Sequence, residues 1–525
     1  MATPTNVVNL DALIRRADLA AIGEQGDDIE VMSINGLEPG GMLYPALRKP
    51  DFQRETANWT PDAVADLIVT FAKRELIPAL ILWRSGQDVF VIDGAHRLSA
   101  LIAWVHDDYG DGDISRKFFQ NAIPDEQKRN AQRTRDIVNV EVGSYDDHRK
   151  AITAPETARA DIRERAARLG WERIPVQWIR NADHDKAEKA FFRINQGGQT
   201  IDPVERRILQ ARGSATALAS RAILRGGTGN QYWKAFEAEV RASIEDIGRE
   251  IQQLLFEPAL VLPVKTLDIP VAGQGYGPRI LPTVFDLVNL VNRVSVKDSS
   301  HKRVSGDGLL SDPTGEATIS YLANVRRVLR RICSTHPSSL GLHPALYFYS
   351  RGGTFQVSAL LNYIVLFSDW DTPEFLKFTQ VRAKFEEFIL SNPGITEAVR
   401  RLGSGTRSRP RVLSFYRRLI ARLSEGVSPK ELAAEMAKDP VYEFLVAADN
   451  VADLLDEAGS FDRDVKGAAY IRQALPSAPK CLTCGGLLHR NGMQVGHRKA
   501  KRDGGSGTLA NSGMQHPFCN STVAN

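Results

Sequence analysis

The sequence predicts a multidomain α+β protein with a mixed α/β first part, a mainly helical middle part and a small metal-stapled final module. Strand-like and helix-like segments alternate at first, long helical periodicities dominate residues 230–460, and three of the four cysteines lie in the last 45 residues. A chain of 525 residues is too long for one ordinary core. We therefore expect domains at residues 1–215, 216–470 and 471–525.

The first part begins with residues that look irregular up to about residue 45. A helix is expected to start at Pro61 with Thr60 as its N-cap and to end at about Arg74. The segments IPALILW and VFVID predict strands around the turn RSGQD, and a helix from His96 through Trp104 follows. A polar insertion then runs from YGDGDISRK to about Arg135. The segments IVNVEVG and IPVQWIR predict further strands, and DKAEKAFFRIN and DPVE predict helices that complete an α/β domain.

The middle part shows long helical periodicities without a repeat of fixed length. Examples are YWKAFEAEVRASIEDIGREIQQLLF, ISYLANVRRVLRRI, VLSFYRRLIARL and PKELAAEMAKDPVYEFLVAADNVADLL. Linkers rich in Gly, Ser and Asp separate some of these segments. We therefore expect an irregular helical domain and not a solenoid, and no motif in it indicates a function.

Composition restricts the class of protein. A hydrophobic fraction of 43% with 25% charged residues is typical of a globular chain. No run of about 18 uncharged apolar residues occurs, so no membrane partner is expected. The N-terminus lacks the apolar core of a signal peptide, which favours the cytoplasm. The net charge of +4 is small for this length, so the distribution of charge is more informative than its sum.

The cysteines of the last module have the spacing of a structural zinc site. Cys481 and Cys484 form a CxxC pair, and His516 and Cys519 form an HxxC pair about thirty residues later. Four thiolate and imidazole ligands in two close pairs suit tetrahedral zinc, and a site closed by four protein ligands is structural. Cys333 stands apart and is expected to be an ordinary buried residue. On these residues alone, the module could be a zinc ribbon that only binds a partner.

The residues between the two pairs favour a second role. The order CxxC, GH, GG, N and a final CN resembles the HNH (ββα-metal) nuclease family over the last 45 residues. The resemblance implies that His497 is the general base, that Asn511 pins the loop between the strands, and that Asn520 holds a catalytic Mg²⁺ or Mn²⁺ ion. Gly496 stands where many members have a second metal ligand, so Asp503 or Gln494 are candidates for that role.

Two further features of the module concern its surface. His489 is a further candidate for the site, and the preferred interpretation is a lone surface histidine. Basic residues outnumber acidic ones in this segment, as is expected of a module that faces phosphates. The candidate DNA-binding residues are Arg498, Lys499, Lys501 and Arg502.

Three separated blocks near the front, KPDFQRETANW, VFVIDGAHRLSAL and FFRINQGGQTIDPVE, resemble in this order the motifs of the DUF262 family. The family's usual glutamine is replaced here by Ala95. The resemblance implies a ParB/sulfiredoxin-like α/β fold that binds or hydrolyses a nucleoside triphosphate (NTP). The matching candidate nucleotide-binding or sensing residues are Gln53, Arg54, Asp93, Gly94, His96, Arg97, Arg193 and Asn195. His96 and Arg97 lie in the first turn of a helix, where phosphate charge is favoured; no Walker A motif is present.

A DUF262 front with an HNH end resembles the modification-dependent restriction enzymes of bacterial phage defence, of which the GmrSD type attacks sugar-modified DNA and the SspE type responds to phosphorothioate DNA. The leading hypothesis is a DNA endonuclease or nickase controlled by a nucleotide-binding and modification-sensing front domain. The alternatives are a nucleotide-dependent sensor whose zinc module grips DNA without cutting, and an interaction scaffold. The partners expected are DNA, from phage or host, and a nucleotide. The oligomeric state is open, and cleavage of both strands would be compatible with a dimer.

Overall fold

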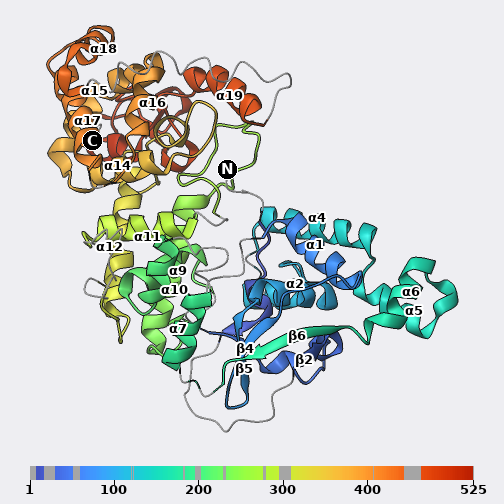
Figure 1. Cartoon of the computed structure of the whole chain (residues 1–525). Helices are drawn as coiled ribbons and strands as arrows, with labels where there is room; N and C mark the ends of the chain where they lie inside the picture. Colours follow the sequence, from blue (N-terminus) through green and yellow to red (C-terminus); the bar gives the residue numbers. More distant parts are fainter. Residues whose placement is uncertain are drawn as a thin grey trace.

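The computed structural model divides into an α/β part and a larger helical part that ends in a small hairpin module (Figure 1). The residues that it describes are 7–16, 30–50, 59–119, 121, 123–180, 182, 184–194, 203–228, 232–275, 280–294, 309–405, 407–442 and 463–523. The mixed α/β character expected from the sequence is confirmed. No helix in the described ranges is both long and apolar enough to cross a membrane.

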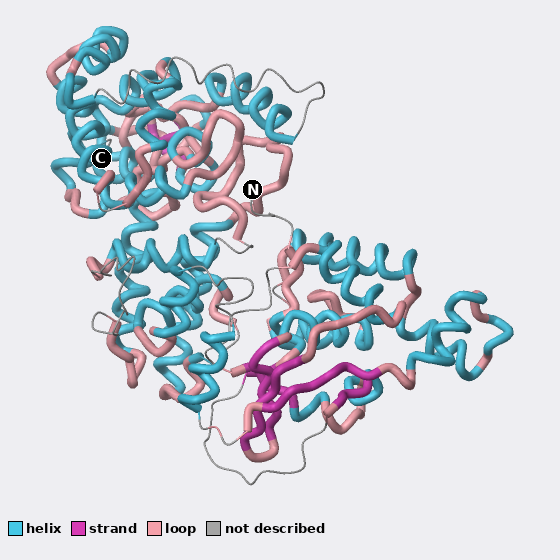
Figure 2. The backbone as a smooth tube through the Cα atoms, viewed as in Figure 1, coloured by secondary structure: helices cyan, strands magenta, loops and turns pink. Residues whose placement is uncertain are grey.

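The α/β part is built on a mixed sheet. Its six strands within the described residues follow the order β1-β3-β5-β4-β6-β2 (Figure 2). Their bounds are Arg15–Arg16 (β1), Val31–Ser33 (β2), Leu47–Lys49 (β3), Leu80–Ser85 (β4), Asp88–Asp93 (β5) and Arg173–Trp178 (β6). β4 and β5 form an antiparallel hairpin, whereas β3 pairs with β5 and β4 pairs with β6 in parallel. β1 and β2 lie in the stretch that looked irregular, because strands this short carry no readable alternation.

Helices pack around this sheet, and α5 and α6 project away from it (Figure 1). The helices are Pro61–Ala72 (α1), Ala95–His106 (α2), Asp113–Phe118 (α3), Asp125–Glu141 (α4), Tyr145–Thr153 (α5), Ala160–Leu169 (α6), His184–Ile194 (α7) and Pro203–Gln210 (α8). α1 begins as predicted, because the Thr60 hydroxyl accepts a hydrogen bond from the Ala63 N–H at 3.2 Å. The predicted β4–β5 hairpin, the strand β6 and the helices α2, α7 and α8 are also confirmed.

The prediction for residues 110–143 was wrong. The expected polar insertion contains α3 and the first part of α4, and the expected strand IVNVEVG covers the last turn of α4 and the two residues after it. The buried face of α4 includes Gln127, Asn130 and Thr134 beside Ala131 and Val138, so polar residues hide its helical period. These polar groups are satisfied inside the fold: the Asn130 amide donates to the Val7 carbonyl at 2.9 Å. Tertiary hydrogen bonds therefore hold a helix face that lacks the continuous apolar stripe by which a helix is predicted from sequence.

The helical part continues directly from the α/β part. Its helices are Ala215–Leu224 (α9), Ala238–Phe256 (α10), Ile280–Val291 (α11), Glu316–Ile332 (α12), Pro344–Tyr347 (α13), Val357–Ser368 (α14), Thr372–Ser391 (α15), Pro393–Arg401 (α16), Arg409–Ser424 (α17), Pro429–Lys438 (α18) and Arg463–Ala474 (α19). A hydrophobic cluster extends from Ala219 in α9 to Leu487 and Phe518 in the last module. The last module therefore shares a core with the helices.

A buried group of charges joins the two parts of the chain. The Lys49 ammonium lies 2.6 Å from the Asp11 carboxylate, and the Arg225 guanidinium lies 2.7 Å from the other oxygen of Asp11. All three side chains are at most 5% exposed. Charges buried this far are stable only as a paired group. The group ties the N-terminal segment and β3 to the residue that follows α9.

His489 is the second correction, because it is 1% exposed and not a surface residue. Its ring lies edge-on to that of His343, with 5.4 Å between ring centroids. Its Nδ1 atom lies 3.9 Å from the sulfur of Cys333, which is buried as predicted. The residues that cover His489 precede it by about 150 positions, so its local sequence does not reveal its burial.

The two buried histidines predict a loss of stability in acid. Burial lowers the pKa of His343 to about 3 and the pKa of His489 to about 4. The ordinary value of about 6.5 applies to the unfolded chain, which therefore takes up protons first as the pH falls. The stabilisation is complete above about pH 6.5 and decreases below it, and between pH 7 and pH 5 each histidine should cost about 2 kcal/mol.

Thermal unfolding at pH 7 and pH 5 checks this expectation. His343→Gln should show a smaller fall in Tm between the two pH values than the wild type. His336→Gln, at an exposed histidine, should keep the wild-type fall. Equal falls in all three proteins would show that the buried histidines do not cause the acid sensitivity.

Candidate functional site

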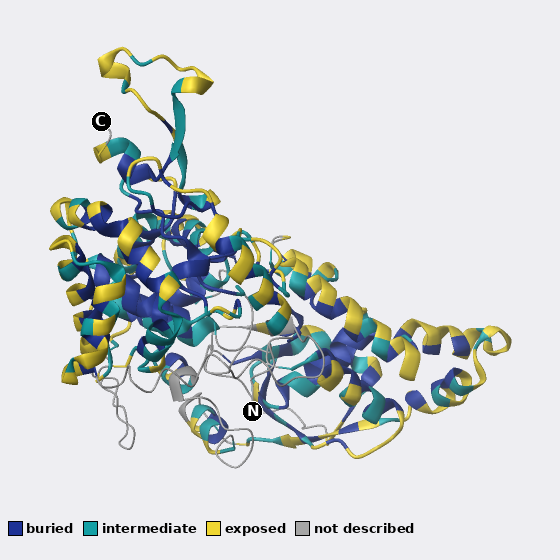
Figure 3. Cartoon of the chain, turned by 90° about the horizontal axis from the view of Figure 1, so that it is seen from above, coloured by how far each residue is buried: buried dark blue, intermediate teal, exposed yellow. Residues whose placement is uncertain are grey.

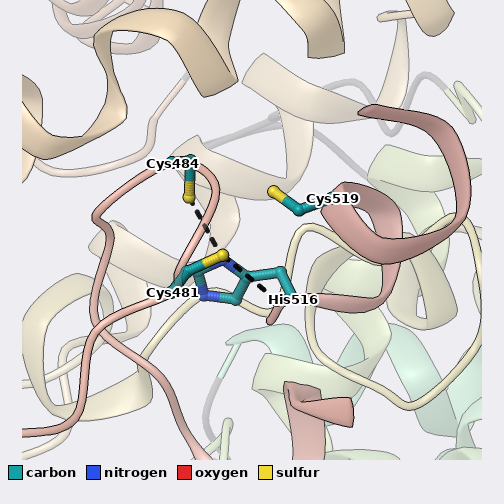
Figure 4. A group of neighbouring side chains, drawn as sticks. All are labelled: Cys481, Cys484, His516 and Cys519. Atoms are coloured by element: carbon teal, nitrogen blue, oxygen red, sulfur yellow. Dashed lines mark hydrogen bonds between the residues drawn. The ribbon is translucent and has the colours of Figure 1, made fainter. Parts of the chain in front are cut away.

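The four predicted zinc ligands meet at the base of the last module. One ligand atom from each of Cys481, Cys484, His516 and Cys519 lies within 4.8 Å of the other three (Figure 4). Ligand atoms of a tetrahedral zinc with Zn–S bonds of about 2.3 Å lie somewhat closer, at about 3.8 Å. A small contraction around an ion would therefore complete the site.

Local structure explains how the ligands reach one another. The first pair is held in a tight turn, in which the Cys481 N–H donates to the Gly486 carbonyl at 2.8 Å. Gly485 has a φ of 70°, which glycine adopts without strain. The second pair lies at the end of a strand, and His516 Nδ1 is 3.3 Å from the Cys484 sulfur. Because His516 Nε2 faces the Leu487 carbonyl at 3.0 Å, the proton belongs on Nε2 and Nδ1 can bind a metal.

The ionisation of these groups fits a cation. Hydrogen bonds from Cys484 and Cys519 lower the pKa of Cys481 far below its usual value. The same contact with Cys481 raises the pKa of Cys484 to about 11, and the pKa of Cys519 is raised as well. Contacts among the three sulfur atoms therefore oppose ionisation of all three cysteines at once, and a cation between them would remove this opposition. Burial lowers the pKa of His516, which keeps it neutral as a ligand must be.

A buried ion pair from α15 supports the zinc ligands. Arg382 and Glu386 lie 2.7 Å apart and are at most 3% exposed. Glu386 accepts the Leu487 N–H at 2.6 Å, and Arg382 donates to the carbonyls of Leu340 and Gly341 and lies 3.3 Å from His516 Nδ1. A Cβ atom at Gly486 would meet Arg382 Nε at 2.5 Å, so the turn that holds Cys481 and Cys484 packs directly on this side chain. Sequence reading missed this pair, because an Arg–Glu pair at i,i+4 resembles an exposed helix pair.

The hairpin beyond the zinc site carries His497 and Asn511, and Asn520 lies on the short helix that follows the hairpin. Strands Gln494–His497 (β7) and Ser512–Gln515 (β8) pair antiparallel, with His497 opposite Ser512. The hairpin stands out from the body of the molecule and has an exposed loop at its far end (Figure 3). His497 is exposed on β7, and Asn520 follows the second ligand pair on the short helix Cys519–Val523.

Asn511 makes the contacts that pin this loop. Its Oδ1 accepts the Lys499 N–H at 2.8 Å, and its Nδ2 donates to the carbonyls of Lys499 and Ser506 at 3.1 and 2.8 Å. The main chain after His497 is therefore fixed against the start of β8. The candidate DNA-binding residues Arg498, Lys499, Lys501 and Arg502 are all exposed along this loop.

Gly496 is required by the position of Asn520. A Cβ atom at residue 496 would lie 2.5 Å from Asn520 Oδ1, so any larger residue would displace the asparagine. The space that a side chain at residue 496 would need is thus occupied by Asn520. Of the two substitutes considered, Asp503 is exposed and lies 4.0 Å from Arg502. Gln494 accepts a hydrogen bond from Asn520 at 3.1 Å, so it contacts a predicted ligand.

The candidate residues of the α/β part lie where β5 meets α2. Gly94 has a φ of 92° and directly precedes α2, and a Cβ atom there would meet Leu80 at 2.4 Å. Arg97 forms an ion pair of 2.6 Å with Asp93, and His96 stacks on Trp59 with 5.5 Å between ring centroids. The helix start is therefore present, but the charge of Arg97 is already paired with Asp93.

Arg193 is exposed near the end of α7, which packs on β4 and β5 through Phe191. Gln53, Arg54 and Asn195 lie outside the described residues. The structure therefore brings Asp93, Gly94, His96 and Arg97 together.

Residues 36–212 match the family model described as the N-terminal domain of the GmrSD restriction endonuclease. The match supports an N-terminal domain of the GmrSD restriction type, and it includes the β5–α2 residues. No curated protein and no solved structure matches the chain. The matched range covers about a third of the sequence and ends before the helical part and the last module.

The zinc site predicts one zinc per chain in the purified protein. Cys484→Ser should lose the metal and lower Tm, because the closed cluster would lack a ligand. Elemental analysis and thermal unfolding measure both effects. Cys333→Ala, at a buried cysteine outside the cluster, should keep one zinc per chain. Zinc loss in both variants, or its absence from the wild type, would contradict the assignment.

The buried ion pair predicts an asymmetric response to substitution. Arg382→Met should destabilise the protein by about 3–5 kcal/mol, because Glu386 would remain buried without its partner. Arg382→Met combined with Glu386→Gln should recover part of this loss. Arg293→Met, which breaks the exposed pair with Asp369, should cost at most about 1 kcal/mol. Urea unfolding compares the variants, and a similar cost for both arginines would refute the role of burial.

Proposed function

We propose that this protein is a DNA endonuclease or nickase of bacterial phage defence, with its cutting site on the β7–β8 hairpin. The observation that carries the proposal is that the last module presents His497 on an exposed strand, fixes the loop after it through Asn511, and packs Asn520 Oδ1 against Gly496, the residue before His497. The restriction-type family match of residues 36–212 independently favours DNA as the substrate. The exposed basic loop residues supply the phosphate contacts such a substrate needs.

The chemistry proposed is hydrolysis of a phosphodiester bond. His497 takes a proton from a water molecule, the water oxygen bonds to phosphorus, and the bond from phosphorus to the leaving sugar oxygen breaks. Asn520 would hold a divalent cation, Mg²⁺ or Mn²⁺, which supplies charge stabilisation at the phosphate when bound. Asn520 offers one amide oxygen, so the cation would take most of its ligands from water and DNA phosphate. The zinc keeps the hairpin and the Asn520 helix in register.

Control by the α/β part is the second component of the proposal. Its β5–α2 junction would bind an NTP, with His96 and Arg97 in the first turn of α2 as the phosphate contacts. Release of Arg97 from Asp93 would be needed for that contact, which offers a simple response to a bound anion. DNA modification, such as phosphorothioate linkage or glucosylated bases, is the proposed signal. The buried Asp11 group is one described contact through which this state would reach the helices.

His497→Ala tests the cutting site. Wild type should cleave supercoiled DNA with Mg²⁺ or Mn²⁺, and the variant should be at least about 100-fold slower because the general base is lost. Plain plasmid, phosphorothioate DNA and glucosylated phage DNA should be compared with and without NTP. The variant should keep its zinc and its Tm, since His497 is exposed.

The other outcomes have separate meanings. Equal cleavage by wild type and His497→Ala would remove the proposed base. If neither protein cuts any substrate while both bind DNA and nucleotide, the zinc module grips DNA without cutting, and the nucleotide-dependent sensor replaces the nuclease.

A further inference from the structure

We propose that Gln494 is a positioning residue that sets the orientation of the Asn520 side-chain amide. The inference rests on the proposed function, because it concerns how the same site presents an oxygen to a divalent cation. An asparagine can bind a cation only through its amide oxygen, since its NH₂ group carries donors and no lone pair for a metal. A contact that keeps Asn520 from flipping would therefore increase the affinity of the site for the cation.

The orientation begins at a main-chain carbonyl of the helical part. Gln494 Nε2 lies 2.6 Å from the Thr335 carbonyl oxygen. A carbonyl oxygen only accepts hydrogen bonds, so the nitrogen end of Gln494 must face Thr335. The Oε1 end of Gln494 is then turned away from Thr335. The usual ambiguity between the two ends of an amide is thus resolved by an atom that has one possible role.

The orientation of Gln494 in turn determines that of Asn520. Gln494 Oε1 lies 3.1 Å from Asn520 Nδ2, and an acceptor oxygen requires the NH₂ end of Asn520 at this contact. Asn520 Oδ1 is consequently directed to the other side, against Gly496 on β7, the residue before His497. A flipped Asn520 would lose its bond to Gln494 and place two oxygens against each other. The order of hydrogen bonds therefore favours the metal-binding orientation.

The segment that holds Gln494 also holds the helix that carries Asn520. The Ser339 carbonyl accepts the Phe518 N–H at 2.9 Å, and the Pro337 carbonyl accepts the Ser521 hydroxyl at 2.8 Å. Three carbonyls between α12 and α13 thus fix the strand and the helix on either side of the site. The helical part, and not the hairpin alone, would set the geometry around Asn520.

Mn²⁺ binding by the full-length, zinc-loaded protein tests the proposal without relying on cleavage. The free Mn²⁺ signal in electron paramagnetic resonance gives a Kd in the presence of a short DNA duplex, in a His497→Ala background that leaves the duplex intact. Gln494→Met keeps the length of the side chain but removes its amide, and should raise the Kd about 10-fold. Zinc content and Tm should stay at their reference values.

Asn491→Leu is the matched control. The Asn491 amide also donates a hydrogen bond from the last module to the helical part, at 2.7 Å to the Glu257 carbonyl. Because this bond does not involve Asn520, the variant should keep the reference Kd. An unchanged Kd in Gln494→Met, or an equal rise in Asn491→Leu, would overturn the proposal.

Asn520→Asp supplies a second, independent check. Both oxygens of a carboxylate can bind a cation, so no orientation has to be selected. Gln494→Met should therefore leave the Mn²⁺ Kd unchanged or lower in the Asn520→Asp background. A 10-fold rise in both backgrounds would show a general structural effect and refute the positioning role.

The proposed function is judged separately, by cleavage with the wild-type protein. Cleavage together with Mn²⁺ binding that does not depend on Gln494 would remove this inference and leave the nuclease in place. No cleavage, together with the expected pattern of Mn²⁺ binding, would remove the nuclease and leave the orientation mechanism in place.

Discussion

The last module depends on a buried charge pair that comes from another part of the chain. Arg382 and Glu386 on α15 contact the turn of the first cysteine pair, the Leu340–Gly341 carbonyls and the ring of His516. Ions buried this deeply are held only when almost every donor and acceptor is used. Arg382 and Glu386 use their hydrogen-bonding groups on main-chain atoms of the last module and of the helical part. The last module is therefore packed on the helices as part of one core. A module built in this way moves with the helical part.

Rigid attachment has a chemical consequence for the hairpin. The main-chain carbonyls between α12 and α13 bond to β7 and to the short final helix, so residues of the helical part hold both Gln494 and the helix of Asn520. Gly496 is the point at which this packing is tightest, because Asn520 Oδ1 occupies the space of a side chain. Only glycine at position 496 allows the asparagine to pack against the strand.

The α/β part is joined to the same helical body through the Asp11, Lys49 and Arg225 group. Its candidate ligand-binding residues lie at the start of α2, about 400 residues before the hairpin in the sequence. The Arg97 guanidinium is already paired with the Asp93 carboxylate, so an incoming anion would compete with Asp93 for the guanidinium. A competition of this kind is a local event that the helices could transmit, because the buried group next to β3 resists independent movement of the two parts.

Much of the local structure follows from the sequence. Thr60 and Pro61 mark the start of α1, the RSGQD turn marks the β4–β5 hairpin, and the CxxC and HxxC spacings bring four ligands together. The helix start, the hairpin and each pair of candidate ligands depend on residues close in the chain, for which local patterns are informative. The two ligand pairs, more than thirty residues apart, meet through the β7–β8 hairpin. The domain boundaries at residues 215 and 470 and the catalytic roles stay predictions.

What only the tertiary structure decided involves residues far apart in the chain. The helix α4 replaces an expected strand because distant carbonyls satisfy its buried amides, as Val7 does for Asn130. His489 is buried because His343 covers it, and Gln494 gains its partner from Thr335. Local sequence determined most of the elements and the identity of the candidate zinc ligands, whereas long-range packing determined α4, which polar groups are buried and how the site amides are oriented. The physical reason is that burial and hydrogen-bond direction depend on neighbours that only the folded chain brings together.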